Sequence, residues 1–367
     1  MEPTSTTGFV CDTFNCKPNF DEAMKRIEAW FLGQVLDRPP VRFHGHNAEF
    51  DHGGDKNLTP EQWRERWFDF DAVVERAAAA MDSARWLGET FPVFMPNLGP
   101  AVYSAFYGCE LTFEETTSWA QHCVQSPEDL NKLVLDRSNA YYKGIMDLTE
   151  KALEAAKGRF MVGYTDLHPG FDSVASWRDS QEICFDFIDE PELIETLLEL
   201  SIRDFHAIYD EFDAVLKNAG QLSCTWMGIP SVGKLHIPSC DFAALISPDM
   251  FNQYGLPILK KEVQGMTENI FHLDGPGVAN HLDTILSVSE ITAIQWVQGY
   301  GPERPIMQYV PMIQKIQAAG KSVVVDLDLE NLNAFMDAVK PEGILLCINE
   351  HDETVQADVI ASLLKWK

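Results

Sequence analysis

Two side chains that can bind a metal stand two positions apart at the end of an apolar segment. His272 and Asp274 close the run Ile270 to Asp274, which is typical of a β-strand. Residues i and i+2 of a strand point to the same face, so we expect these two groups side by side. Cys347 stands near the end of a second apolar run, Gly343 to Asn349. An imidazole, a carboxylate and a thiolate would bind Zn²⁺ and leave a fourth position for substrate or water.

Spacing alone leaves other interpretations of these residues open. His272 and Asp274 could be a hydrogen-bonded pair, and Cys347 an inert thiol, since cysteine is among the most buried residue types. Either Cys224 or Cys240 could also take the place of Asp274 in a metal site. The metal interpretation therefore needs independent support.

Polar and aromatic side chains also stand at the ends of the other apolar runs, where parallel strands of a barrel place their reactive groups. The candidates for substrate binding are Asn97, Asp166, His168, Cys224, Trp226, Gln295, Trp296 and Asp326. The two tryptophans could stack on a flat or cationic substrate, or could belong to the core. Glu350, which follows the last run, is a candidate catalytic acid or fourth metal ligand.

The elements that must position these groups are short apolar runs separated by amphipathic helical stretches. Several runs are apolar on both faces, which indicates a parallel sheet covered by helices on each side. The expected strands are 93–98, 160–166, 222–229, 242–247, 270–274, 293–297, 322–328 and 343–349. Eight parallel strands over residues 91–367 predict an α/β fold of the (β/α)8 TIM barrel type. An open, doubly wound sheet is the alternative.

The segment 1–90 is expected to be an N-terminal helical extension that caps the barrel. Its expected helices are 20–36, 60–66 and 70–87, and Thr59 followed by Pro60 is a typical helix start. A loop between the first two helices carries His44 and His46, which we expect either to cap the pocket or to lie on the surface.

Composition limits the classes of partner. The 367 residues include 28 Lys and Arg against 56 Asp and Glu, a formal net charge of −28 that disfavours nucleic acids and anionic membranes. No apolar run is long enough to cross a bilayer. Eight scattered cysteines, without a recognisable signal peptide, predict a reducing, cytoplasmic location.

Residues from about 90 onward resemble the uroporphyrinogen decarboxylase superfamily and, within it, the corrinoid (cobalamin)-dependent methyltransferases. The similarity rests on segments 186–192, 246–251, 255–257 and 271–275. Methylcobamide:coenzyme M methyltransferases of this superfamily bind zinc through His-x-Cys and a distant cysteine. His272 and Cys347 match two of these ligands, whereas Asp274 occupies the place of the first cysteine.

The resemblance implies a zinc-dependent methyltransferase. Exchanging a thiolate for a carboxylate makes a harder metal site, which favours an oxygen-containing substrate. We therefore expect a methyl group to move from a small O-methyl compound to the Co(I) corrinoid of a separate partner protein. The demethylated oxygen would leave as an alkoxide or phenoxide stabilised by the metal.

Two other functions remain open, a uroporphyrinogen decarboxylase-like enzyme and a non-catalytic binding module on the same fold. The N-terminal segment lacks the arginine-rich motif that implies tetrapyrrole binding in the decarboxylases, and no Lys or Arg ends a predicted strand. The pocket is therefore expected to prefer a neutral or cationic methyl donor, or an anion whose charge the metal meets.

Overall fold

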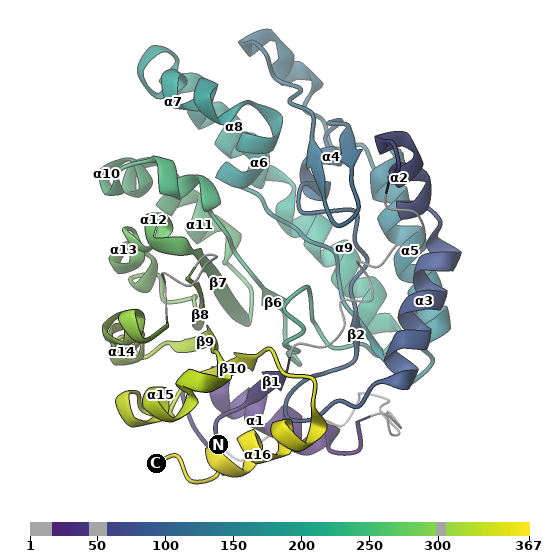
Figure 1. Ribbon diagram of the computed structural model, residues 1–367. Helices are drawn as coiled ribbons and strands as arrows, with labels where there is room; N and C mark the ends of the chain where they lie inside the picture. Colours follow the sequence, from purple (N-terminus) through teal and green to yellow (C-terminus); the bar gives the residue numbers. More distant parts are fainter. Residues whose placement is uncertain (1–16, 44–56, 299–305) are drawn as a thin grey trace.

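A curled sheet of six parallel strands forms the centre of the protein (Figure 1). The computed structural model describes residues 17–43, 57–298 and 306–367. In spatial order, the sheet contains β1 (Val41–Phe43), β10 (Ile344–Ile348), β9 (Ser322–Asp326), β8 (Ala293–Val297), β7 (Glu268–Asp274) and β6 (Leu235–His236). All neighbouring strands pair in parallel.

A parallel pair, β2 (Val93–Phe94) and β5 (Met161–Val162), lies between the two ends of this sheet. The amide of Glu89 donates to the carbonyl of Val41 on β1 at 2.7 Å, and the amide of Tyr164 donates to that of Cys224 at 2.9 Å. The result is an α/β half-barrel with a separate pair of strands across its open side.

Helices pack around the strands (Figure 1). They are α1 (Phe20–Phe31), α2 (Pro60–Trp67), α3 (Phe70–Ser83), α4 (Val102–Ala105), α5 (Ala140–Ala156), α6 (Phe171–Trp177), α7 (Ser180–Asp189), α8 (Pro191–Arg203), α9 (Phe205–Asn218), α10 (Pro248–Met250), α11 (Leu256–Glu262), α12 (Gly275–Ala279), α13 (Leu282–Leu286), α14 (Val310–Ala318), α15 (Leu332–Ala338) and α16 (Glu353–Leu363). Within the described residues, no helix combines the length and the apolar character that crossing a membrane requires.

The four expected strands nearest the C-terminus are confirmed as β7 to β10, and the first two are present in shortened form as β2 and β5. The strand expected at 242–247 is wrong. Phe242, Ala243 and Ile246 are buried while Leu245 is exposed, which is a helical spacing, and residues Asp241–Leu245 form the 3₁₀ turn η3.

The strand expected at 222–229 is also wrong. The chain turns back on itself there, so that Ser223 and Ser231 form an isolated antiparallel bridge. Gly228 adopts a φ of +62°, which a regular strand does not allow. Two strands replace the missing ones, β6 and β1. Because β1 lies within the segment 1–90, that segment contributes to the sheet as well as supplying helices, and the boundary at residue 90 stays a prediction.

Strand alternation separates two apolar clusters. Inward side chains such as Leu235, Ile270 and Leu345 pack inside the curled sheet, where α1 adds Met24 and Ile27. Outward side chains pack against the surrounding helices. Polar residues on the inward face near the C-terminal strand ends are therefore the ones available to a ligand.

A disulfide bond joins Cys109 and Cys123, whose Cα atoms lie 5.6 Å apart. It closes the base of an antiparallel hairpin formed by β3 (Leu111–Phe113) and β4 (Ser118–Ala120). Scattered cysteines do not reveal their pairing from sequence alone, so this bond was not expected.

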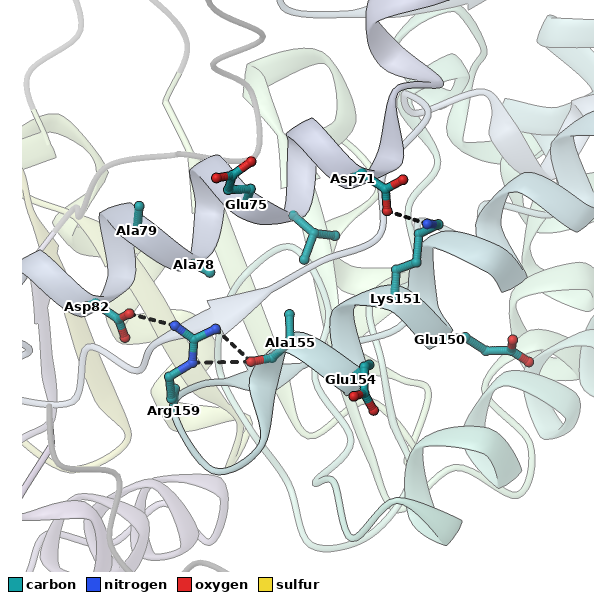
Figure 2. A pocket seen from close by; sticks show the side chains of 11 residues that line it. Asp71, Glu75, Ala78, Ala79, Asp82, Glu150, Lys151, Glu154, Ala155 and Arg159 are labelled. Carbon is teal, nitrogen blue, oxygen red and sulfur yellow. Dashed lines mark hydrogen bonds and ion pairs between the residues drawn. The ribbon is translucent and has the colours of Figure 1, made fainter.

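A groove of about 670 Å³ runs between α3 and α5 on the outer surface (Figure 2). Ion pairs join its two walls, Lys151 with Asp71 and Arg159 with Asp82, the latter at 2.6 Å. Its lining contains no histidine or cysteine. Exposed ion pairs of this kind contribute little to stability, so we assign the groove no chemistry.

Candidate metal centre

Asp241, His272 and Asp274 bring one possible ligand atom each within 4.8 Å of one another. His272 and Asp274 lie on β7, and Asp241 begins the turn η3 that follows β6. The expected proximity of His272 and Asp274 is therefore confirmed, because strand alternation alone produces it. The third member of the cluster comes from the neighbouring strand end.

Backbone contacts between the two strand ends set this arrangement. The amide of His272 donates to the carbonyl of Pro238 at 2.9 Å, which continues the pairing of β6 with β7 and brings Asp241 alongside. The Asp241 carboxylate accepts from the hydroxyl of Ser239 at 3.1 Å, and its backbone amide donates to Asp172 at 2.8 Å. These two contacts hold Asp241 in place.

Gln295 orients the imidazole of His272. It pairs with His272 across β7 and β8, and its side-chain oxygen lies 2.6 Å from His272 Nδ1. An amide oxygen can only accept, so Nδ1 carries the proton and Nε2 presents its lone pair to a metal. The ring of Trp226 lies nearly perpendicular to the imidazole, with ring centroids 5.3 Å apart.

The donor set fits a divalent metal. One imidazole and two carboxylates are ligands that Zn²⁺ accepts, and they are harder than the thiolates of a cysteine-rich zinc site. Asp241 and Asp274 are exposed and His272 is partly exposed. Water or substrate can therefore reach the remaining coordination positions.

Cys347 is not a member of this cluster among the described residues. It lies on β10, separated from β7 by β8 and β9 in the sheet, and its side chain belongs to the inner apolar cluster. Burial raises the pKa of the Cys347 thiol to about 12, although the nearby Arg42 opposes this. In the metal-free protein the thiol is protonated at neutral pH.

Three of the predicted substrate residues share a cavity with the metal cluster. A cavity of about 660 Å³ is lined by Asp166, His168 and Trp226 together with Asp241 and His272. The structure thus joins polar groups from the segments that follow β5 and β6, from the 222–231 segment and from β7. This cavity is large enough for a small organic substrate.

The other predicted substrate residues do not line this cavity. Trp296 is fully buried in the outer cluster against Tyr309, because it alternates with the inward Gln295. Cys224 is fully buried, and burial raises the pKa of its thiol to about 12. Asn97 accepts a hydrogen bond from the amide of Gly99 and so shapes the loop after β2.

The four remaining candidates from the sequence are Asp326, Glu350, His44 and His46. Asp326 lies on β9 opposite Cys347, so it faces the interior. Glu350 accepts hydrogen bonds from the amides of His351 and Asp352 and thus shapes the turn that precedes α16. The proposed cap residues His44 and His46 lie outside the described residues.

His168 and Asp166 form a charged pair at the cavity wall, with His168 Nε2 2.7 Å from an Asp166 carboxylate oxygen. Burial lowers the pKa of His168, but the charge and hydrogen bond of Asp166 outweigh it. Asp172 and Asp241 add to the same effect, and the pKa rises to about 9. The imidazolium is therefore the main form at neutral pH.

We predict that His168 makes the stability pH-dependent. Its pKa is about 9 in the folded protein and 6.5 when unperturbed, so its contribution is complete below pH 6.5 and is lost as the pH rises towards 9. The difference corresponds to about 3 kcal/mol. Urea unfolding at pH 6.5 and pH 9 should show a fall in the free energy of unfolding that is smaller in His168→Gln by roughly this amount. An equal fall in both proteins would contradict the assignment.

No family model and no curated protein matches the sequence. Among solved structures, a methyltransferase from Methanosarcina mazei aligns with a TM-score of 0.59 at 12% sequence identity. The alignment covers 94% of this chain and 98% of that chain. The two chains share a fold.

Proposed function

We propose that this protein is a metal-dependent methyltransferase of the uroporphyrinogen decarboxylase superfamily. It would move a methyl group from a small methylated compound to the Co(I) corrinoid of a separate protein. The observation that carries the proposal is the cluster of Asp241, His272 and Asp274 at the strand ends. The fold shared with a solved methyltransferase along nearly the whole chain supports the same reaction class.

The barrel itself is part of this proposal. The strands β1, β2, β5 and β6 to β10 would make the eight members of a distorted (β/α)8 barrel. The hydrogen bonds from Glu89 to Val41 and from Tyr164 to Cys224 link β2 and β5 towards the two ends of the six-stranded sheet. The cluster would then lie at the C-terminal face, where barrels of this type place their active sites.

We propose Zn²⁺ as the metal, with Asp241 as its third ligand and Cys347 as the alternative. When bound, the metal supplies Lewis-acid stabilisation of the negative charge on the departing oxygen. Gln295 holds His272 in the ligating tautomer, and Ser239 orients Asp241. The imidazolium of His168 lies in the same cavity and could return a proton to the demethylated product.

The proposal places the methyl acceptor on a separate protein. Among the described residues, the free thiols are Cys224, Cys240 and Cys347, which are buried with raised pKa values, and Cys184, which does not line the cavity. A Co(I) corrinoid is a strong nucleophile and would complete the reaction. Its carrier protein would dock over the C-terminal strand ends.

Methyl transfer to cobalt tests this function. The zinc-loaded protein is mixed with methoxylated, N-methylated and S-methylated compounds, with and without a reduced corrinoid protein, and the cobalt spectrum is followed. We expect methylation of cobalt with an O-methyl donor, and no demethylation when the corrinoid protein is left out. Asp249→Ala, which changes an exposed carboxylate outside the cluster, serves as the control. Demethylation without corrinoid, or no transfer across the panel, would contradict the proposal; the second result would favour a binding module.

A further inference from the structure

Asp241 lies in a short arc of chain, 238–243, that is held at both ends by the segment carrying the other two possible ligands. At one end, the amide of His272 donates to the carbonyl of the first residue of the arc at 2.9 Å. At the other end, His281 Nε2 lies 2.8 Å from the carbonyl oxygen of Ala243. A carbonyl oxygen only accepts, so Nε2 of His281 carries the proton and donates. The arc therefore has one hydrogen bond to this segment on each side of Asp241.

The helix α12 brings His281 to this position. It begins directly after Asp274, and His281 comes shortly after its last residue. The helix also packs closely on the turn η3, because a Cβ atom on Gly277 would lie only 2.8 Å from the Cβ atom of Ala244. Only a residue without a Cβ atom allows this approach. The close packing and the hydrogen bond of His281 thus act on the same end of the arc.

The imidazole of His281 is fixed in a closely packed environment. It is buried and packs against the ring of Phe251, with ring centroids 4.7 Å apart. Phe251 begins the π-helical turn η4 (Phe251–Gly255), where a Cβ atom on Gly255 would lie 2.7 Å from the Phe251 ring. The glycine therefore leaves room for that ring. Two of the segments on which the family resemblance rests, 246–251 and 255–257, thus help to hold His281 in place.

The hydrogen bond to Ala243 is the only one that His281 forms through its side chain among the described residues, because Nδ1 is buried without a partner. A phenylalanine here would avoid the cost of that unpaired acceptor, so stability alone does not account for a histidine. His281 is not a member of the metal cluster and does not line the cavity. Any effect on the site must therefore pass through η3.

We propose that His281 is a positioning residue of the metal centre. Its hydrogen bond to Ala243 fixes the end of η3 and thereby keeps the Asp241 carboxylate beside the other ligands. The contacts with Ser239 and Asp172 act on residues 239–242 and leave this end of the turn to His281. Supporting contacts around a metal site typically contribute ten- to a hundredfold in affinity. The role rests on the metal of the proposed function, but its test needs no methyl transfer.

Competition with a chromophoric chelator measures the zinc affinity of each variant. His281→Phe keeps an aromatic ring beside Phe251 but leaves the carbonyl of Ala243 without its donor, so the affinity should fall by about tenfold or more. His281→Gln retains an N–H donor and should restore most of it. His206 Nε2 also lies 2.8 Å from a carbonyl oxygen, that of Lys261, so His206→Phe is the matched control and should bind zinc as the parent does.

Combining variants separates the positioning of Asp241 from a general effect on the fold. Asp241→Ala removes the ligand that His281 positions. In that background, His281→Phe should change the zinc affinity by less than about twofold, because the turn has no ligand left to position. The visible spectrum of the Co(II)-loaded protein responds to the coordination of the metal. It should change with His281→Phe alone and stay unchanged when His281→Phe is added to Asp241→Ala.

A second variant acts on the same turn from α12. Gly277→Ala adds a methyl group that meets Ala244, so the backbone of η3 must shift and the zinc affinity should fall, although alanine favours a helix. This loss should also disappear in the Asp241→Ala background. Circular dichroism and urea unfolding establish that each variant is folded.

Equal losses of zinc affinity with and without Asp241 would overturn the positioning role. Zinc binding by His281→Phe as tight as that of the parent would also overturn it. If the parent binds neither Zn²⁺ nor Co(II), the inference falls together with the metal centre. Positioning by His281 in a protein that transfers no methyl group to cobalt would refute the proposed reaction and leave the metal centre standing.

Discussion

Replacing His272 by alanine should reduce the zinc content of the purified protein from about one atom per chain to background. His272 is the only nitrogen donor of the cluster, and two carboxylates alone make a weak zinc site. Methyl transfer should fall with the metal content, because stabilisation of the leaving oxygen is lost. Elemental analysis and the cobalt assay measure the two effects on the same preparation.

A second variant should show a smaller loss of zinc affinity. Gln295→Leu removes the acceptor of His272 Nδ1 without removing a ligand, and such supporting contacts typically contribute ten- to a hundredfold in metal affinity. His206→Ala, which alters a histidine outside the cluster, is the matched control and should keep its zinc. If His272→Ala retains zinc as tightly as the parent does, the metal site lies elsewhere.

Replacing Glu89 by glutamine should lower the free energy of unfolding by about 3–5 kcal/mol, because breaking a buried ion pair leaves a charge without its partner. Glu89 is completely buried and binds Arg38 through two hydrogen bonds of 2.7 and 2.8 Å. It also pairs with Arg26 and accepts from the amide of Val41 at 2.8 Å. Urea unfolding of the parent and the variant measures the loss.

An exposed ion pair provides the comparison. Arg85 and Glu353 lie 3.3 Å apart with more than half of each side chain exposed, so Glu353→Gln should change the free energy of unfolding by less than about 1 kcal/mol. Similar losses in the two variants would mean that burial does not decide the contribution of Glu89.

The part of the site that could be predicted from sequence depends on local geometry. His272 and Asp274 lie together because a strand alternates its faces, a rule that needs no knowledge of the rest of the fold. The same rule, applied to Gln295 and Trp296, separates an inward amide from an outward tryptophan. Assigning both residues to the pocket overlooked this alternation.

The remaining parts of the site depend on contacts between distant segments. Asp241 joins the cluster because Pro238 and His272 continue the pairing of β6 and β7, which the misplaced strand at 242–247 concealed. The strand β1 enters the sheet because a three-residue segment pairs with β10, some 300 residues further along the chain. Short strands next to prolines carry too little periodicity to be recognised from sequence.

X-ray absorption at the zinc edge tests the central claim most directly, because it identifies the atoms around the metal. Ligation by Asp241, His272 and Asp274 predicts only nitrogen and oxygen neighbours, at about 2.0–2.2 Å. A sulfur neighbour at about 2.3 Å would contradict this set and would restore Cys347 as a ligand. A protein that binds no zinc at all would contradict the metal centre itself.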